Sequence, residues 1–138
     1  MNPGSERLSF VPMDPHSDPR GWVLNPFEGL PPGSSVSNCH VFSAGPGARR
    51  GNHVHSDREE RVVVLSGSLV ARDLDTGEEI ELSPERPGML RIAPAVPHLF
   101  ENRGLTTAVA ICFSAVAPPA PGGEEDRGGP PSGSVSLR

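Results

Sequence analysis

The chain has 138 residues, which is enough for one domain with one modest hydrophobic core. Its formal charge is −5 at pH 7, so we expect no nucleic-acid partner, because proteins that bind nucleic acids usually carry a basic face. No apolar run approaches the roughly 20 residues needed to span a bilayer. The first ten residues also lack the basic and apolar segments of a secretory signal. We therefore expect a cytoplasmic protein with no membrane segment.

Two residue types are missing from the sequence. There is no tyrosine and no lysine, so the twelve basic residues are all arginine. These absences exclude Schiff-base chemistry on lysine and a tyrosine general acid. The two cysteines, Cys39 and Cys112, stand among apolar or β-forming residues and within no thiol motif. We expect both to be small buried side chains rather than a disulfide.

The composition divides the chain into three regions. Residues 1–35 are irregular and rich in proline, with short β-like pieces at 8–11 and 22–24, and predict an N-terminal arm with short edge strands. Residues 36–117 form the β-rich part. Residues 118–138 contain ten proline or glycine residues and a run of charges, which predicts a flexible tail that buries too little apolar surface to become ordered.

The β-rich region alternates short apolar runs with turn residues. A β-branched run ends at Ser66-Gly67, and the sequence Asp75-Thr76-Gly77 is typical of a hairpin turn. Turns recur about every ten residues, which favours an antiparallel sandwich or barrel, and no helical periodicity or internal repeat is present. The predicted strands are 39–43, 61–65, 68–73, 79–82, 90–92, 99–101 and 108–114.

Metal-ligating side chains gather in one stretch of this region. His53 and His55 are two residues apart, so on a strand both would point to the same face. Glu60 follows after a short turn, where a neighbouring strand would bring its carboxylate beside the two imidazoles. His98 comes after a proline-rich turn at the start of a further strand, which favours an inward-facing position. Mixed nitrogen and oxygen ligands suit one divalent ion such as zinc, nickel, manganese, iron or copper.

The spacing of these residues resembles the first motif of the cupin superfamily. That motif has a glycine, five residues, His-x-His, three or four residues, a glutamate, six residues and a glycine. Gly47, His53, His55, Glu60 and Gly67 occupy its fixed positions. The motif also tolerates Glu59 as the carboxylate, although the six-residue spacing to the final glycine favours Glu60.

The second cupin motif is matched less completely. His98 and Asn102 stand at its histidine and asparagine positions. Ala93 and Ala95 replace the usual proline and glycine, and Gly88 is one residue out of register. The resemblance covers residues 36–117. It implies an all-β fold, a cupin jelly-roll barrel or double-stranded β-helix, and a metal site of His53, His55, Glu60 and His98.

A finer resemblance concerns cupins that act on nucleotide-linked sugars. The segments Asp18-Pro19-Arg20-Gly21 and Arg50-Gly51-Asn52-His53-Val54-His55 resemble the D-x-R-G and R-G-x-H-x-H segments of deoxysugar epimerases, ketoisomerases and the cupin domain of capsular-polysaccharide reductases. The resemblance implies that His53 is a base or a ligand and that Arg50 or Arg20 contacts the diphosphate or the sugar. An arginine fork suits phosphate physically. If a metal occupies the His-x-His pair, His40 is an alternative base.

Three functions remain open on the sequence. The leading one is isomerisation or epimerisation of a small polar substrate of the sugar or ketone type. The alternatives are a metal-dependent dioxygenase of small molecules and a non-catalytic small-molecule-binding cupin. We also expect a homodimer, because such barrels expose edge strands and this chain carries an apolar arm able to cover one.

Overall fold

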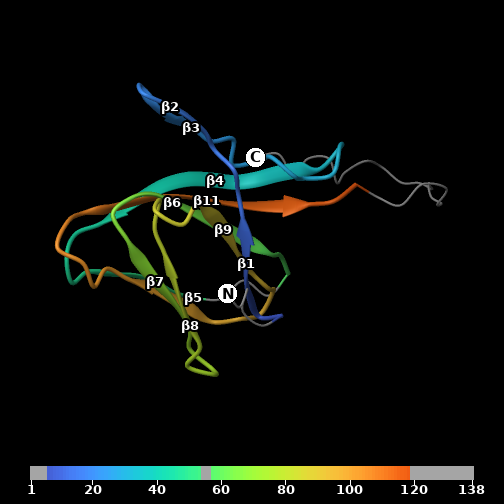
Figure 1. Cartoon of the computed structure of the whole chain (residues 1–138). Helices are drawn as coiled ribbons and strands as arrows, with labels where there is room; N and C mark the ends of the chain where they lie inside the picture. The colour runs from blue at the N-terminus through green and yellow to red at the C-terminus, as the bar shows by residue number, and fades with distance from the viewer. Residues whose placement is uncertain (1–5, 54–56, 119–138) are drawn as a thin grey trace, which may run out of the picture.

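Antiparallel pairing organises the chain into two curved sheets that face each other, and a short separate hairpin (Figure 1). The computed structural model describes residues 6–53 and 57–118, and every regular element within them is a β-strand. No helix in this part of the chain is long and apolar enough to cross a membrane. The predicted all-β fold is confirmed. The predicted tail lies beyond the described residues, apart from its first residue.

The larger sheet has five strands in the order β1-β9-β6-β11-β4, and the smaller has four in the order β5-β10-β7-β8. The five-stranded sheet consists of β1 (Leu8–Pro12), β9 (Gly88–Ile92), β6 (Glu60–Ser66), β11 (Ala108–Val116) and β4 (Ser35–Ala44). The four-stranded sheet consists of β5 (Arg49–His53), β10 (His98–Glu101), β7 (Leu69–Asp73) and β8 (Glu79–Leu82). The hairpin pairs β2 (His16–Asp18) with β3 (Gly21–Val23).

The core lies between the two sheets, and a second apolar layer lies outside the larger one. On β6, Val62 and Val64 belong to the interior cluster, whereas Val63 belongs to the outer one. Residues of the N-terminal arm cover this outer face, where the ring of Phe27 meets the ring of Phe113 edge-on at 4.9 Å. The β-branched run of β6 is therefore buried on both faces, which explains why its sequence does not alternate with polar residues.

The two cysteines differ in exposure. Cys112 is buried in the centre of the larger sheet, as predicted. The same prediction is wrong for Cys39, which is exposed. Cys39 lies on β4, the last strand of the sheet, next to Asn38, whose φ of 53° marks an irregularity in the strand. An edge strand with a local distortion leaves this side chain without the cover that Cys112 receives on both sides.

Candidate functional site

His98 opens β10 and points into the interior. Its side chain is 1% exposed, and its Nδ1 atom lies 2.9 Å from the carbonyl oxygen of Val96. A carbonyl oxygen only accepts hydrogen bonds, so Nδ1 carries a proton and donates it. The other ring nitrogen, Nε2, lies 2.9 Å from Oε1 of Glu60. The backbone just before β10 therefore determines which ring nitrogen faces the barrel interior.

Glu60 opens β6 and is also buried, at 7% exposed. Its second carboxylate oxygen accepts a hydrogen bond from the thiol of Cys112 on β11, with Oε2 and Sγ 2.9 Å apart. Burial raises the pKa of the Cys112 thiol, and the negative charge of Glu60 raises it further. The thiol thus stays protonated and acts as a donor that fixes the orientation of the carboxylate.

The contact between His98 and Glu60 requires a positive charge. If the imidazole is neutral with its proton on Nδ1, the lone pair of Nε2 faces a carboxylate oxygen at 2.9 Å, which is repulsive unless a proton or a cation lies between them. Burial lowers the pKa of His98, but the hydrogen bonds to Glu60 and to the Val96 carbonyl, together with the negative charges of Glu60 and Asp73, outweigh burial, so the pKa is raised overall.

The same geometry suits a divalent metal ion. Two adjacent ligands, each about 2.1 Å from one ion, lie roughly 3 Å apart, close to the separation of these two atoms. A histidine that donates its Nδ1 proton to a backbone carbonyl presents Nε2 to a metal in the usual way. Among the side chains that the structure describes, which do not include those of His53 and His55, no group of three or more His, Cys, Asp or Glu is placed to hold an ion. The described residues therefore provide one half of the predicted ligand set.

The strand that ends at His53 lies beside His98. In the pairing of β5 with β10, His53 is opposite His98, and Arg50 is opposite the buried Phe100. Directly opposed residues share a face of an antiparallel sheet, so the backbone of His53 holds an inward register position. The side chain of His53, and all of His55, lie outside the described part of the chain. Their role as ligands stays a prediction.

Glu59 and Glu60 point in opposite directions. Glu59 accepts hydrogen bonds from Arg61 Nε at 2.9 Å and from Arg91 Nη2 at 2.7 Å. Glu60 faces the interior, because successive side chains of a strand alternate between its two faces. The structure thus places Glu60, and not Glu59, beside His98.

The predicted base His40 sits at a solvent-exposed position on β4. Its Nδ1 lies 2.8 Å from the carbonyl oxygen of Asn38. A row of rings connects it to the interior: His40 to Phe42 at 6.5 Å, Phe42 to Phe100 at 5.5 Å, and Phe100 to His98 at 5.6 Å between centroids. Aromatic rings therefore separate the exposed His40 from the buried His98.

The two predicted substrate-binding arginines are separated in the structure. The exposed Arg50 donates from Nε to the carbonyl oxygen of Ser43, and with Arg49 it lines an open surface pocket of about 440 Å³. Arg20 lies in the turn between β2 and β3, where it donates to Asp18 at 2.6 Å. The β2–β3 hairpin projects away from the two sheets (Figure 1). Within one chain, Arg20 is therefore not brought to the His98 site.

The sequence alone did not identify three residues of this region as members of a site. Cys112 was expected to be only a buried apolar side chain. Asp73 is fully buried and is directly opposite His98 in the pairing of β7 with β10. Arg7 reaches Asp73 from the N-terminal arm. A signal for Asp73 was present: it continues the alternation of the buried residues Leu69 and Ala71, so it had to face inward.

The departures from the second cupin motif are accommodated by the backbone. Ala95, which replaces the glycine, has a φ of 66°, in the region that glycine adopts most easily. Asn102 is buried, and its side-chain amide donates to the carbonyl oxygens of Ala44 and Thr106, both at 2.8 Å. The Asn102 side chain thus ties the end of β10 to the end of β4 and to the turn before β11.

The two facing sheets form an all-β fold of the cupin, double-stranded β-helix type. The sequence matches the model of the polysaccharide biosynthesis C-terminal domain family over residues 16–117, so the chain belongs to that family. It is 29% identical over 121 residues to UDP-2-acetamido-2,6-beta-L-arabino-hexul-4-ose reductase of Pseudomonas aeruginosa. This alignment covers 80% of the chain but only 32% of the reductase, so the chain spans about a third of that protein's length.

Two solved structures with a similar fold are enzymes that act on sugars. The sugar 3,4-ketoisomerase QdtA of Thermoanaerobacterium thermosaccharolyticum, in complex with TDP, matches with a TM-score of 0.65 and 18% identity, over 79% of this chain and 81% of that one. The dTDP-6-deoxy-D-glucose-3,5-epimerase RmlC of Legionella pneumophila, in complex with dTDP-4-keto-L-rhamnose, matches with a TM-score of 0.63 and 18% identity, over 97% of this chain and 89% of that one. These likenesses show an RmlC-like cupin fold.

Proposed function

We propose that the chain epimerises or isomerises a keto sugar linked to a nucleoside diphosphate, and that it holds one divalent metal ion on His53, His55, Glu60 and His98. One observation carries the proposal: Nε2 of His98 faces the carboxylate of Glu60 at 2.9 Å inside the barrel, beside the strand that begins the His-x-His segment. The reductase and the ketoisomerase described above support the substrate class, because the names of both refer to a sugar and the latter is seen with TDP.

Isomerisation or epimerisation next to a ketone requires a group that takes a proton from carbon and a group that returns one. A divalent ion, when bound, would polarise the ketone and make that proton more acidic. The chain has no tyrosine, so we assign the proton transfer to a histidine. The exposed His40 is the candidate when the metal ion occupies His53, and His53 is the candidate when it does not. Arg50 is the candidate contact for the diphosphate, since a guanidinium matches phosphate oxygens with paired hydrogen bonds.

The metal part of the proposal is tested by metal analysis of the full chain, purified without chelator and without an affinity tag. We expect close to one divalent ion per chain in the wild type and a large loss in His98→Ala and Glu60→Gln. Glu59→Gln is the matched control, because that carboxylate binds Arg61 and Arg91 instead. Wild-type protein that takes up no metal even after reconstitution, or equal metal in the control and the two site variants, would overturn the ligand assignment.

The activity is tested by proton NMR in deuterated water with TDP-4-keto-6-deoxyglucose and with a UDP-linked 4-keto sugar. We expect deuterium to enter the carbon beside the ketone of at least one substrate, and to enter much more slowly with His98→Ala. Reconstituted, folded protein that catalyses no exchange on either substrate would refute the isomerase assignment. The two substrates together also separate a preference for thymidine from a preference for uridine.

A further inference from the structure

The loop of residues 93–97 leads directly into His98, and it is tied to the rest of the fold at both ends. At its start, the backbone N–H of Ala93 donates to the carbonyl oxygen of Arg7 at 3.0 Å. At its end, the carbonyl oxygen of Pro97 accepts from the N–H of Leu74 at 2.9 Å. The first hydrogen bond comes from the N-terminal arm and the second from the β7–β8 turn, so two segments far apart in the sequence hold this loop.

This loop sets the orientation of the imidazole. The Val96 carbonyl, which accepts the Nδ1 proton of His98, is part of it. Ala95, just before, has a φ of 66°, a conformation that costs a non-glycine residue about 1 kcal/mol and persists only where the surroundings hold it. A change in the loop would therefore move the acceptor that fixes the ring.

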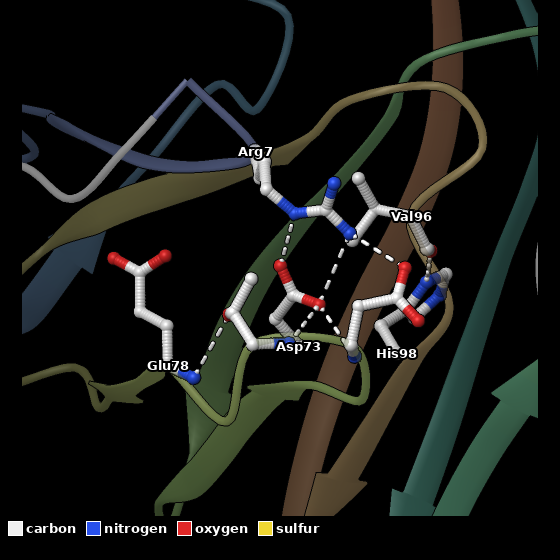
Figure 2. Close-up of polar contacts among 7 residues, drawn as sticks. Arg7, Asp73, Glu78, Val96 and His98 are labelled. Carbon is white, nitrogen blue, oxygen red and sulfur yellow. Dashed lines mark hydrogen bonds and ion pairs between the residues drawn. The ribbon is translucent and has the colours of Figure 1, made fainter.

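An ion pair between the partly exposed Arg7 and the buried Asp73 joins the N-terminal arm to the β7–β8 turn (Figure 2). Arg7 donates from Nε to Oδ2 of Asp73 at 2.5 Å and from Nη2 to Oδ1 at 3.2 Å. Oδ1 of Asp73 also accepts the backbone N–H groups of Asp75 at 2.9 Å and Thr76 at 3.3 Å. Nη2 of Arg7 further donates to Oδ2 of Asp75 at 2.9 Å. One guanidinium thus fastens the arm to the turn that holds the far end of the loop.

Asp73 is also a potential competitor for His98. The two residues are directly opposite each other on β7 and β10, and opposed side chains in an antiparallel pair lie within contact range. Asp73 is fully buried, and the two hydrogen bonds from Arg7 engage both of its carboxylate oxygens. A charged carboxylate released from Arg7 would attract the Nδ1 proton of His98 away from the Val96 carbonyl.

We propose that Arg7 is a positioning residue for His98. By engaging Asp73 and anchoring the loop, it keeps the Nδ1–H group of His98 hydrogen-bonded to the carbonyl oxygen of Val96. Nε2 is thereby held toward Glu60. The expected loss of metal affinity when Arg7 is replaced rests on the proposed function, whereas the expected change in the orientation of the His98 imidazole does not. The N-terminal arm therefore contributes to the site through the contact between Arg7 and Asp73.

The test uses the full chain labelled with ¹⁵N-histidine and freed of metal with chelator. Long-range ¹⁵N–¹H NMR gives the protonation of each ring nitrogen and the exchange rate of the Nδ1 proton with water, and a His98→Ala spectrum identifies the His98 signals. We expect a protected Nδ1 proton in the wild type and exchange at least tenfold faster in Arg7→Gln. Arg7→Lys, which keeps the charge but loses the fork, should fall between the two.

The control variant is Arg103→Gln. Arg103 forms a comparable pair of charge contacts, with Glu79 and Glu101 of the same sheet. It should leave the Nδ1 exchange rate unchanged. It should lower stability less than Arg7→Gln does, because Asp73 is fully buried whereas Glu79 and Glu101 are partly exposed. Unchanged Nδ1 exchange in Arg7→Gln, whatever its loss of stability, would overturn the proposal and leave Arg7 as a structural ion pair. If Arg7→Gln does not fold, the comparison of Arg7→Lys with the control decides in the same way.

A second measurement separates this proposal from the proposed function. Titration with Zn²⁺ in a competition assay should show a dissociation constant about tenfold higher for Arg7→Gln than for the wild type, the effect expected when the group that orients a metal-binding histidine is lost. Wild type that binds no Zn²⁺, with the NMR effect still present, would refute the metal site and leave the positioning role intact. Equal Zn²⁺ affinity in the two proteins, together with unchanged exchange, would refute the positioning role.

Discussion

Gly67, the last glycine of the first cupin motif, should resist substitution for two separable reasons. Its φ is 73°, and a Cβ atom built there would lie 2.7 Å from the carbonyl oxygen of Thr107 and 2.8 Å from Cα of Ala108. The positive φ costs about 1 kcal/mol for alanine, and moving a packed backbone adds about 1–3 kcal/mol. Gly67→Ala should therefore lower the free energy of unfolding by about 2–4 kcal/mol.

Gly77 provides the matched control. Its φ is 81°, but a Cβ atom there would meet nothing within 4 Å, so Gly77→Ala isolates the cost of the backbone conformation at about 1 kcal/mol. Urea unfolding followed by circular dichroism, with an unchanged dependence on denaturant, gives both values. If the two variants lose the same free energy within about 0.5 kcal/mol, the close approach of the β10–β11 turn to Gly67 contributes nothing and the reasoning is wrong.

Two further predictions concern the N-terminal arm. A Cβ atom on Gly88 would lie 2.0 Å from the ring of the buried Phe10, so Gly88→Ala should lower the free energy of unfolding by about 2–3 kcal/mol. The loss should be clearly smaller in a Phe10→Ala background, and equal losses in the two backgrounds would refute the clash. Arg7 lowers the pKa of Asp73 to about 2 in the folded protein, whereas the pKa of an aspartate in the unfolded chain is about 4. The stabilisation of the fold by this ion pair is therefore fully present above about pH 4 and disappears as the pH falls through about 2. Asp73→Asn should therefore cost up to about 2 kcal/mol at pH 7 and progressively less below pH 4, and a loss independent of pH would contradict the ion pair.

The sequence alone determined most of the strands, because alternation and turn residues act over a few neighbouring positions. The run 79–82 coincides with β8, whereas β4 begins at Ser35, four residues before the predicted start. The spacing to Gly67 also favoured Glu60 over Glu59, and the alternation of side chains along β6 places Glu60 inward. Such features depend only on the local period of the chain.

Only the tertiary structure decided which distant residues meet. Arg7 and Asp73 are 66 positions apart, and Cys112 donates to a carboxylate 52 positions away. Their contacts depend on strand order and on the register between strands, and a shift of one residue would turn Asp73 away from His98. Register follows from the packing of the whole sheet, so the partners of His98 and Glu60 emerge only once the two sheets close around them.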